Sequence, residues 1–420
     1  MAGKTIKAIL LGAGQRGRGY CNYALSNPEE LSIIGVAEPN EVRLAELGDK
    51  HKIPGSERFS TWEDVFIRDK WADVVIICTQ DNMHFEPAMA AISKGYDILL
   101  EKPISPDPLE CIKIAQAAEA KGIKVVVCHV LRYTPFFAKI KEIIDSGEIG
   151  KIVTVVHNEN VGDVHHSHSF VRGNWAKAET SSPMILAKSC HDLDIIQWLI
   201  DKNCLKLTSF GSLSYFTGRN WPEGAKERCT DGCKVDCPYD SRKLYINSSN
   251  EWFRSVAAGH ANASDEEVEA AIKTGPYGRC VFKCDNDVVD HQVVSMEFED
   301  GVTAAFSMSS FTPDISRSLK VMGTKGQIKA HSEPNSIKVF DFAARKEREI
   351  IVTTEGGHGG GDDGMMKSFC EYITGIYAGC AISEAKISAD NHMLCFAAEK
   401  SRLGGGAVVE IKAFVEDIVK

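Results

Sequence analysis

Glycine spacing near the start of the chain is the feature that most constrains its fold. The segment TIKAILLGAGQRGRGY, residues 5–20, is an apolar run that ends at Gly12, and Gly14 and Gly17 follow before a stretch typical of a helix. Glycines at this spacing permit a tight turn, a close backbone approach to a pyrophosphate and close packing of the following helix. The segment therefore predicts a strand, a phosphate-binding turn and a helix.

An acidic residue supports this interpretation. A second apolar run, LSIIGVAE, ends at Glu38, 24 residues beyond Gly14. An acid at this position accepts hydrogen bonds from the adenosine ribose hydroxyls of a dinucleotide and repels the 2′-phosphate of NADP. The two features predict a dinucleotide site that favours NAD over NADP, although Arg43 lies close by in sequence.

Apolar runs and helical patterns alternate through the first third of the chain. Further strands are predicted at 72–79, 96–101 and 123–129, with helices at 40–51, 84–95 and 107–122. This alternation predicts a doubly wound parallel sheet, in which ligands lie at the carboxyl ends of the strands. The expected cofactor-binding residues are Gly12, Gly14, Gln15, Arg16, Gly17, Glu38, Thr79, Asp81, His84, Glu101 and Lys102.

The remainder of the chain predicts more strands than helices. The runs VVSMEFE and VTAAFSM flank Asp300-Gly301, a strong hairpin signal, and both alternate apolar with polar residues. Such a pattern predicts an antiparallel sheet with one exposed face, which is suited to contact with a second copy of the chain. The fold class is therefore α/β, with a parallel sheet first and a largely antiparallel sheet second.

Overall composition restricts the partners. A net charge of −10 without a basic run argues against a nucleic-acid surface, and no apolar stretch approaches the roughly 20 residues that span a bilayer. The 14 cysteines, with no secretory signal, are typical of a reducing compartment. We expect a cytoplasmic protein that binds neither nucleic acid nor membrane.

The segment KSCHDLD, residues 188–194, carries several ionisable groups just before the apolar run IIQWLI. On a helix, Lys188, His191 and Asp194 would share one face. The pattern has two interpretations. One is an ordinary polar first turn of a helix, and the other is the reactive end of an enzyme.

Motifs distributed over most of the chain resemble the Gfo/Idh/MocA family, which includes glucose-fructose oxidoreductase and inositol dehydrogenase. The resemblance is carried by Glu101-Lys102-Pro103, by the glycine motif, by His191-x-x-Asp194, and by the segments LRYTPFFAKIKEIIDSGEIGKI and VMGTKGQI. It implies a Rossmann domain, here 1–130, and an α/β substrate-binding and oligomerisation domain with an open sheet, here 131–420. Nicotinamide would lie between the two, and the protein would be a homodimer or homotetramer.

The resemblance also implies roles for individual residues. Lys102 would be the cleft lysine beside the nicotinamide and the reacting carbinol, and Pro103 would follow a cis bond as in relatives. His191 would accept the substrate proton, with Asp194 or Asp192 fixing its tautomer and Lys188 nearby. Many polyol-oxidising relatives have an acid four residues before this histidine, where this chain has Ala187.

Two polar loops are expected to face the substrate. The segments DVHHSHSFVRGNW and GGHGGGDDG mix planar donors, acceptors and an aromatic ring, as sugar sites do. An alternative for His165 and His168 is ligation of Zn or Mn together with a carboxylate. The predicted substrate-binding residues are Arg132, Tyr133, His165, His166, His168, Arg172, Trp175, Asp192 and His358.

Five cysteines lie in a segment that reads as an insertion, about 219–283. Cys229, Cys233 and Cys237 recur every four residues, and Cys280 and Cys284 follow. Two interpretations remain open: a structural zinc site that uses four of the five thiols, or thiols that are free and merely packed.

The sequence thus predicts an NAD-dependent oxidoreductase that transfers hydride between nicotinamide and a secondary hydroxyl of a sugar, glycoside or polyol. One alternative is a redox-assisted glycosidase that keeps NAD bound through oxidation, elimination, hydration and reduction. A second is a nucleotide-binding protein without catalysis, which would leave Lys102 and His191 without a role.

Overall fold

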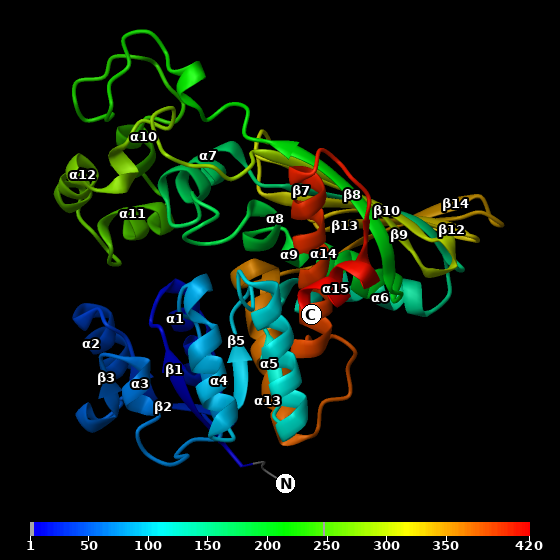
Figure 1. Cartoon of the computed structure of the whole chain (residues 1–420), viewed down its shortest axis with the longest axis horizontal. Helices are drawn as coiled ribbons and strands as arrows, with labels where there is room; N and C mark the ends of the chain where they lie inside the picture. Colours follow the sequence, from blue (N-terminus) through cyan, green and yellow to red (C-terminus); the bar gives the residue numbers. More distant parts are fainter. Residues whose placement is uncertain (1–3, 247) are drawn as a thin grey trace.

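The N-terminal third forms a Rossmann-type domain. The computed structural model describes residues 4–246 and 248–420. Six parallel strands form the first sheet in the order β3-β2-β1-β4-β5-β6 (Figure 1). Their bounds are β1 (Ile6–Leu11), β2 (Leu31–Ala37), β3 (Arg58–Phe59), β4 (Val74–Ile77), β5 (Asp97–Leu100) and β6 (Val125–Val127). The predicted doubly wound parallel sheet is confirmed.

Helices cover both faces of this sheet, which explains why its strands are apolar throughout. They are α1 (Gln15–Ser26), α2 (Glu41–Lys50), α3 (Trp62–Val65), α4 (Phe85–Ser93) and α5 (Pro108–Lys121). Local sequence sets their ends. The Asp107 carboxylate caps α5, Pro108 occupies its first turn, and Gly122 ends it in the left-handed conformation.

The second domain is built on a nine-stranded sheet in the order β14-β13-β12-β11-β7-β10-β9-β8-β15. Only β7 and β10 pair in parallel, so the expected largely antiparallel sheet is confirmed. The predicted hairpin joins β9 to β10 through Asp300 and Gly301, both at positive φ. The strands are β7 (Ile152–Asn160), β8 (Cys204–Ser212), β9 (His291–Phe298), β10 (Thr303–Ser309), β11 (Ser316–Gly323), β12 (Gly326–His331), β13 (Ser336–Asp341), β14 (Lys346–Ile351) and β15 (Val409–Glu410).

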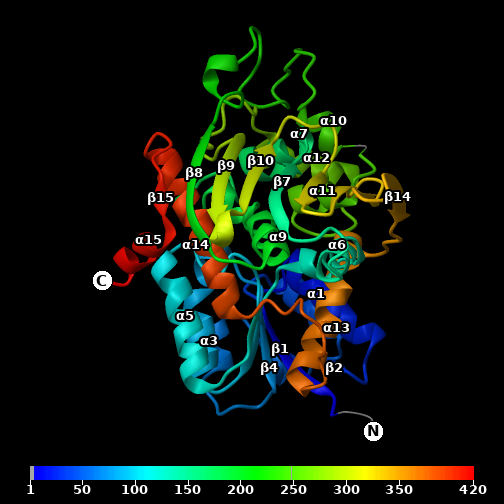
Figure 2. The same ribbon diagram turned by 90° about the vertical axis from the view of Figure 1, so that its right-hand side faces the viewer.

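The two faces of this sheet differ. Helices α6 (Pro135–Asp145), α9 (Cys190–Ile200) and α14 (Ala385–Leu403) lie on one face, and α15 (Ile411–Ile418) packs beside α14 (Figures 1 and 2). Alternate residues of β7, such as Val155 and His157, are buried beneath these helices, whereas Val156 points outward and is exposed. The period-two pattern therefore corresponds to one covered and one uncovered face.

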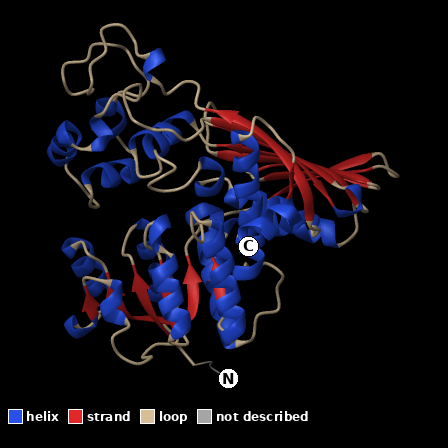
Figure 3. Ribbon diagram, in the orientation of Figure 1, coloured by secondary structure: helices blue, strands red, loops and turns tan. Residues whose placement is uncertain are grey.

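An insertion between β8 and β9 extends from the upper edge of the sheet (Figure 3). It contains three short helices, α10 (Ser241–Tyr245), α11 (Glu251–Ala258) and α12 (Asp265–Thr274), and residues 221–240 are almost entirely turns and loops. Two small apolar clusters lie within it, separate from the main core.

The chain crosses back to the first domain near its end. Helix α13 (Gly361–Thr374) packs against α1 and against the turn η3 (Val130–Tyr133) that follows β6. Val127 N donates to Ser383 O, and α14 then leads back to the second sheet (Figure 2). The two domains are thus joined by several chain segments, with the carboxyl ends of the first sheet facing the second domain.

The segment KSCHDLD does not form one continuous helix. A short helix α8 (Met184–Ala187) ends before Lys188, and α9 begins at Cys190. Lys188 therefore lies at the break, and the expected common helical face of Lys188, His191 and Asp194 is wrong. The first turns of α9 are buried, so its polar residues need partners inside the protein. Across the described residues, no helix combines the length and apolar character needed to cross a bilayer.

Candidate active site

The glycine loop has the geometry of a phosphate cradle. Gly12 has a φ of +90°, and a Cβ there would lie 2.5 Å from the Cys78 carbonyl oxygen. A Cβ on Gly17 would collide with the backbone oxygen of Gly12, whereas one on Gly14 would meet nothing within 4 Å. Gly14 also precedes α1, which starts at Gln15 and has no side-chain cap. The loop therefore leaves open backbone and free helix N–H groups, which suit a pyrophosphate.

Glu38 lies beside this loop at the end of β2. Its carboxylate accepts hydrogen bonds from Ala13 N at 2.7 Å and from Asn40 N at 3.0 Å, and the side chain is buried. These two contacts fix the acid where an adenosine ribose would lie. The glycine loop and Glu38 together fit a dinucleotide.

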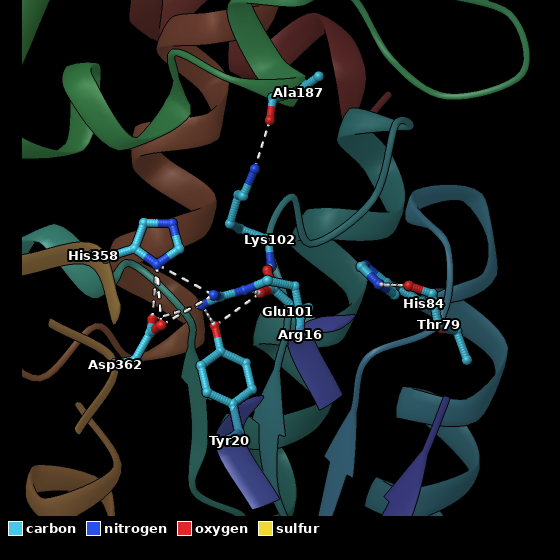
Figure 4. Close-up of polar contacts among 9 residues, drawn as sticks. All are labelled: Arg16, Tyr20, Thr79, His84, Glu101, Lys102, Ala187, His358 and Asp362. Atoms are coloured by element: carbon cyan, nitrogen blue, oxygen red, sulfur yellow. Dashed lines mark hydrogen bonds and ion pairs between the residues drawn. The ribbon is translucent and has the colours of Figure 1, made fainter. Parts of the chain in front are cut away.

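Lys102 connects the two domains. It follows β5, and its Nζ donates to the carbonyl of Ala187 at 2.6 Å (Figure 4). The Lys102–Pro103 peptide bond is cis. The Ala187 side chain offers no acid, so a backbone carbonyl is the partner of the ammonium here. The contact places the Lys102 ammonium against a residue that lies four positions before His191 in the sequence.

Arg16, in the glycine loop, is the centre of a network of charges. It pairs with Glu101 at 2.9 Å and with Asp362 at 2.7 Å, and donates to Tyr20 Oη at 2.5 Å (Figure 4). Burial raises the pKa of Glu101, but the Arg16 and Lys102 charges outweigh this and lower it. The guanidinium thus links the glycine loop to Glu101, which follows β5, and to Asp362 in α13.

His358 lies at the open edge of the same network. Its Nδ1 is 3.1 Å from Asp362 Oδ1 and 3.2 Å from Arg16 Nη1, and its side chain is 46 % exposed. The second predicted polar loop therefore reaches the cofactor cradle and keeps one exposed imidazole there.

His191 is nearly enclosed, and its Nδ1 is buried without a hydrogen-bond partner in the structure. Burial lowers the pKa of His191 well below its usual value, and the positive charge of Lys102 lowers it further. The imidazole is therefore neutral near pH 7, as a proton acceptor must be.

The two aspartates of this segment do not orient His191. Asp194 forms a buried bidentate pair with Arg132, at 2.7 and 2.6 Å. Asp192 accepts from His157 at 2.7 Å and from Arg317 at 2.8 Å. The expectation that either carboxylate fixes the tautomer of His191 is therefore wrong, because both are committed to other partners.

Lys188 belongs to a buried cluster that the sequence did not indicate. Its Nζ lies 3.5 Å from Glu159, which also pairs with Arg317 at 2.5 Å. Burial raises the pKa of Glu159 to about 7, and burial lowers that of Lys188. Alternation along β7 places Glu159 on the covered face with His157, a signal that could have identified it.

His84 and Thr79, two of the expected cofactor residues, form hydrogen bonds around the turn that carries Lys102. His84 is 1 % exposed, with Nδ1 2.7 Å from Pro103 O and Nε2 3.2 Å from Thr79 O. The Thr79 hydroxyl donates to Met83 O. His84 therefore positions the turn that carries Lys102, and its ring has no nitrogen left for a cofactor.

Asp81 reaches across to the second domain. Its Oδ2 accepts from Ser181 Oγ at 3.0 Å and from Trp175 Nε1 at 3.3 Å. Trp175 is half-buried at this contact. The predicted cofactor residue Asp81 and the predicted substrate residue Trp175 are therefore brought together.

Most of the other predicted substrate residues pack inside the protein. His166 is stacked between Phe170 and Phe216, and His168 lies between Phe253 and Tyr277. Burial lowers the pKa of His166 to about 4 and that of His168 to about 3. These rings are buried among aromatic side chains and are not exposed to a substrate.

Four further candidates have internal partners. Arg132 is committed to Asp194, and the Tyr133 hydroxyl lies 3.1 Å from Ser383 Oγ. Arg172 donates to the carbonyls of Arg279 and Tyr239. His165 is half-buried, with Nδ1 3.2 Å from Val161 O.

Metal ligation was an alternative for the histidine loop and for the cysteines. Within residues 4–246 and 248–420, no group of three or more His, Cys, Asp or Glu side chains is arranged to hold a metal ion. His165 and His168 both lie against the ring of Trp252, and no third ligand joins them among the described residues.

The fold and the site define a two-domain oxidoreductase with a nicotinamide dinucleotide cofactor. Residues 6–129 match the family model described as "Oxidoreductase family, NAD-binding Rossmann fold", and residues 141–377 match "Oxidoreductase family, C-terminal alpha/beta domain". The chain belongs to the Gfo/Idh/MocA oxidoreductase family, and the resemblance noted in the sequence is confirmed.

Relatives agree with this assignment. The Bacillus subtilis protein named "Putative oxidoreductase YteT" is 26% identical over 80% of this chain and 81% of its own length. Inositol 2-dehydrogenase of Salmonella typhimurium is also 26% identical, over 47% of this chain and 56% of its own length. The chain therefore spans little more than half of that relative.

A solved structure shows the same fold. Levoglucosan dehydrogenase in complex with NADH and levoglucosan superposes with a TM-score of 0.72 at 16% sequence identity. The superposition covers 97% of this chain and 99% of that one.

Proposed function

We propose that this protein oxidises a secondary hydroxyl of a sugar, glycoside or polyol, with NAD as the hydride acceptor. The observation that carries the proposal is the contact of Lys102 with Ala187, because it brings the lysine of the cofactor domain to the segment that leads to His191. The named activities of inositol 2-dehydrogenase and levoglucosan dehydrogenase support a carbohydrate substrate.

The chain's own residues divide the work of the reaction. Bound nicotinamide supplies an acceptor for hydride at its C4 atom. The neutral imidazole of His191 accepts the hydroxyl proton, and the Lys102 ammonium donates a hydrogen bond to the oxygen as negative charge develops on it. His84 and Glu101 hold the turn that carries Lys102, which keeps the amine in place.

Glu38 supports NAD over NADP. Its carboxylate is buried at the ribose end of the cradle, and no contact of the described residues pairs it with a cation. A 2′-phosphate would meet this negative charge directly. We expect NAD to bind at least tenfold more tightly than NADP, a difference of about 1.4 kcal/mol.

The test is a substrate screen with both cofactors. Purified protein is mixed with NAD or NADP and with inositols, anhydrosugars, hexoses and methyl glycosides, and the absorbance of reduced nicotinamide is followed. Mass spectrometry of the purified protein detects any cofactor that remains bound. Reduction of NAD by at least one carbohydrate, abolished in Lys102→Ala, supports the proposal. No reduction by any of them in the presence of bound NAD contradicts it.

A redox-assisted glycosidase is the second candidate. The observation that favours it is the Glu159–Lys188 pair, because a carboxyl with a pKa raised to about 7 by burial is suited to acid–base steps beyond hydride transfer. An aryl glycoside separates the two candidates. Release of phenol without accumulation of NADH indicates the glycosidase, and accumulation of NADH without phenol indicates the dehydrogenase.

We also propose that copies of the chain associate through the uncovered face of the nine-stranded sheet. Phe210 and Val293 are neighbours in register on this face and are 55% and 45% exposed. Burial of such apolar neighbours favours association. Light scattering should show a dimer or tetramer that Val293→Asp dissociates. The control Val42→Asp, at an exposed site on α2, should leave the mass unchanged.

A further inference from the structure

Four of the five cysteines in the insertion line one small cavity. The cavity has a volume of about 20 Å³, and Cys229, Cys233, Cys237 and Cys280 form part of its wall. This volume accommodates about one water molecule or one ion. Cys284 does not line it, and its thiol donates to the Cys280 carbonyl instead.

A buried arginine shares the wall of this cavity. The Arg172 side chain is 3% exposed in total, and its Nε and Nη2 donate to the carbonyls of Arg279 and Tyr239 at 2.8 and 2.7 Å. Nη2 also lies 3.7 Å from Cys229 Sγ, and Nη1 has no hydrogen-bond partner.

No carboxylate balances this charge. Among the ion pairs of the described residues, none includes Arg172, and the nearby Asp240 is paired with Arg242. A guanidinium stays protonated in proteins, and a buried charge is costly unless an opposite charge compensates it. Neutral thiols do not provide that compensation, whereas thiolates do.

We propose that Cys229, Cys233, Cys237 and Cys280 bind one Zn²⁺ as thiolates, with Arg172 as the counter-ion. Zn²⁺ replaces the four thiol protons, which are released to solvent, and the resulting four-thiolate complex carries a net charge of −2 beside the guanidinium. Thiolates are ligands that favour zinc, and the spacing of three residues between successive cysteines is typical of structural zinc sites.

The thiols are not gathered as a ligand set in the structure, so binding requires them to turn into the cavity. Each must come within about 2.3 Å of the metal. Residues 221–240 are almost entirely turns and loops, so a change in the directions of their side chains breaks no helix or strand. Arg228 anchors the segment through its bridge to Arg279 and by donating to the carbonyls of Ile272 and Gly275.

The site would fix the insertion next to the active-site cleft. Zinc would link the irregular segment that carries Cys229 to the one that carries Cys280. Arg172 ends the helical turn η4 (Ser167–Arg172), and Trp175, three residues later, contacts Asp81. The metal would therefore stabilise the wall of the cleft and take no part in hydride transfer.

Metal content tests the proposal directly. The full-length protein is produced with zinc in the medium, purified under reducing conditions and analysed by mass spectrometry for metals. We expect about one zinc per chain. Cys229→Ser and Cys280→Ser should each lose most of it, whereas Cys284→Ser, which removes a thiol outside the cavity, and Cys380→Ser, at an exposed site, should retain it.

Two further measurements make the test independent of whether a variant folds. Titration of the wild-type protein with a mercurial should release zinc in step with modification of the cavity thiols, and Co²⁺ exchanged into the protein should give thiolate-to-metal charge-transfer absorption. Arg172→Gln should weaken zinc retention at least tenfold, and Arg172→Lys should weaken it less. A folded wild-type protein with less than a tenth of a zinc per chain, or with disulfides among these cysteines, would overturn the proposal.

Discussion

The proposed cofactor-binding and substrate-binding parts of the site are built in different ways. On the cofactor side, Gly12, Gly14 and Gly17 act through backbone shape, and the two bonds that hold Glu38 come from nearby main-chain groups. On the substrate side, polar groups such as Arg132 and Asp192 are paired with residues far away in sequence. The glycine loop and Glu38 therefore depend on backbone geometry, whereas the paired side chains, including Arg16 with Asp362 at the cofactor cradle, depend on the whole fold.

The largest effect is expected at the point where the two sides meet. Lys102→Ala should lower kcat about 10²- to 10⁴-fold, because its hydrogen bond to the developing alkoxide is lost. The dissociation constant for NAD, measured by fluorescence titration, should stay within about threefold, or about 0.7 kcal/mol. Lys113→Ala, at an exposed site on α5, is the control and should behave like the wild type. Equal losses of NAD binding and turnover would contradict the division between the two sides.

Breaking a buried pair tests the claim that Arg132 is structural. Arg132→Met leaves the carboxylate of Asp194 buried without its cation, which should cost about 3–5 kcal/mol of unfolding free energy. Urea denaturation measures the loss. The double variant Arg132→Met/Asp194→Asn should recover part of it. Unchanged stability with a raised KM would instead place Arg132 at the substrate.

The buried histidines give the second domain a dependence on pH. His166 has a pKa lowered to about 4 by burial, whereas an unfolded histidine titrates near 6.5. The unfolded chain therefore binds a proton that the folded chain rejects. Stability is lost as the pH falls from about 6.5 toward 4, by up to about 1.4 kcal/mol per pH unit for this residue.

His166→Phe should remove the pH dependence that His166 causes. It also removes two buried nitrogens that have no hydrogen-bond partner. We expect a gain of about 1 kcal/mol at pH 7, and about 2 kcal/mol more at pH 5. Urea denaturation at the two pH values measures the difference in unfolding free energy. His166→Leu, a smaller apolar replacement, is the control variant. A loss of turnover without a gain in stability would show that the ring serves the substrate.

The smallest effect is expected from a substitution in the glycine loop, and it concerns the affinity for NAD. A methyl group on Gly14 meets nothing in the protein but occupies the path of the pyrophosphate. Gly14→Ala should therefore weaken NAD binding about tenfold, or about 1.4 kcal/mol. Gly19→Ala, also in open space but inside α1, should leave NAD binding unchanged and stabilise the protein by about 0.5–1 kcal/mol. Similar NAD affinities for the two variants would contradict the assignment of the loop.

Sequence analysis predicted the parallel sheet, the largely antiparallel sheet and the glycine cradle, because each follows from local spacing. Through a family resemblance it also predicted catalytic roles for Lys102 and His191, and these roles stay predictions. It could not assign the partners of Asp192 and Asp194, since those pairs join residues that only the folded chain brings together. Glu159 was missed although alternation along β7 places it on the covered face; its pairing with Lys188 and Arg317 is visible only in the folded chain.

The most direct test of the central claim is a crystal structure of the protein with NADH and a bound polyol. The account predicts one substrate hydroxyl within about 2.6–3.2 Å of both Lys102 Nζ and His191 Nε2. Its carbon should lie about 3–3.5 Å from nicotinamide C4. A complex in which Lys102 remains on the Ala187 carbonyl while His191 contacts neither cofactor nor polyol would contradict the account.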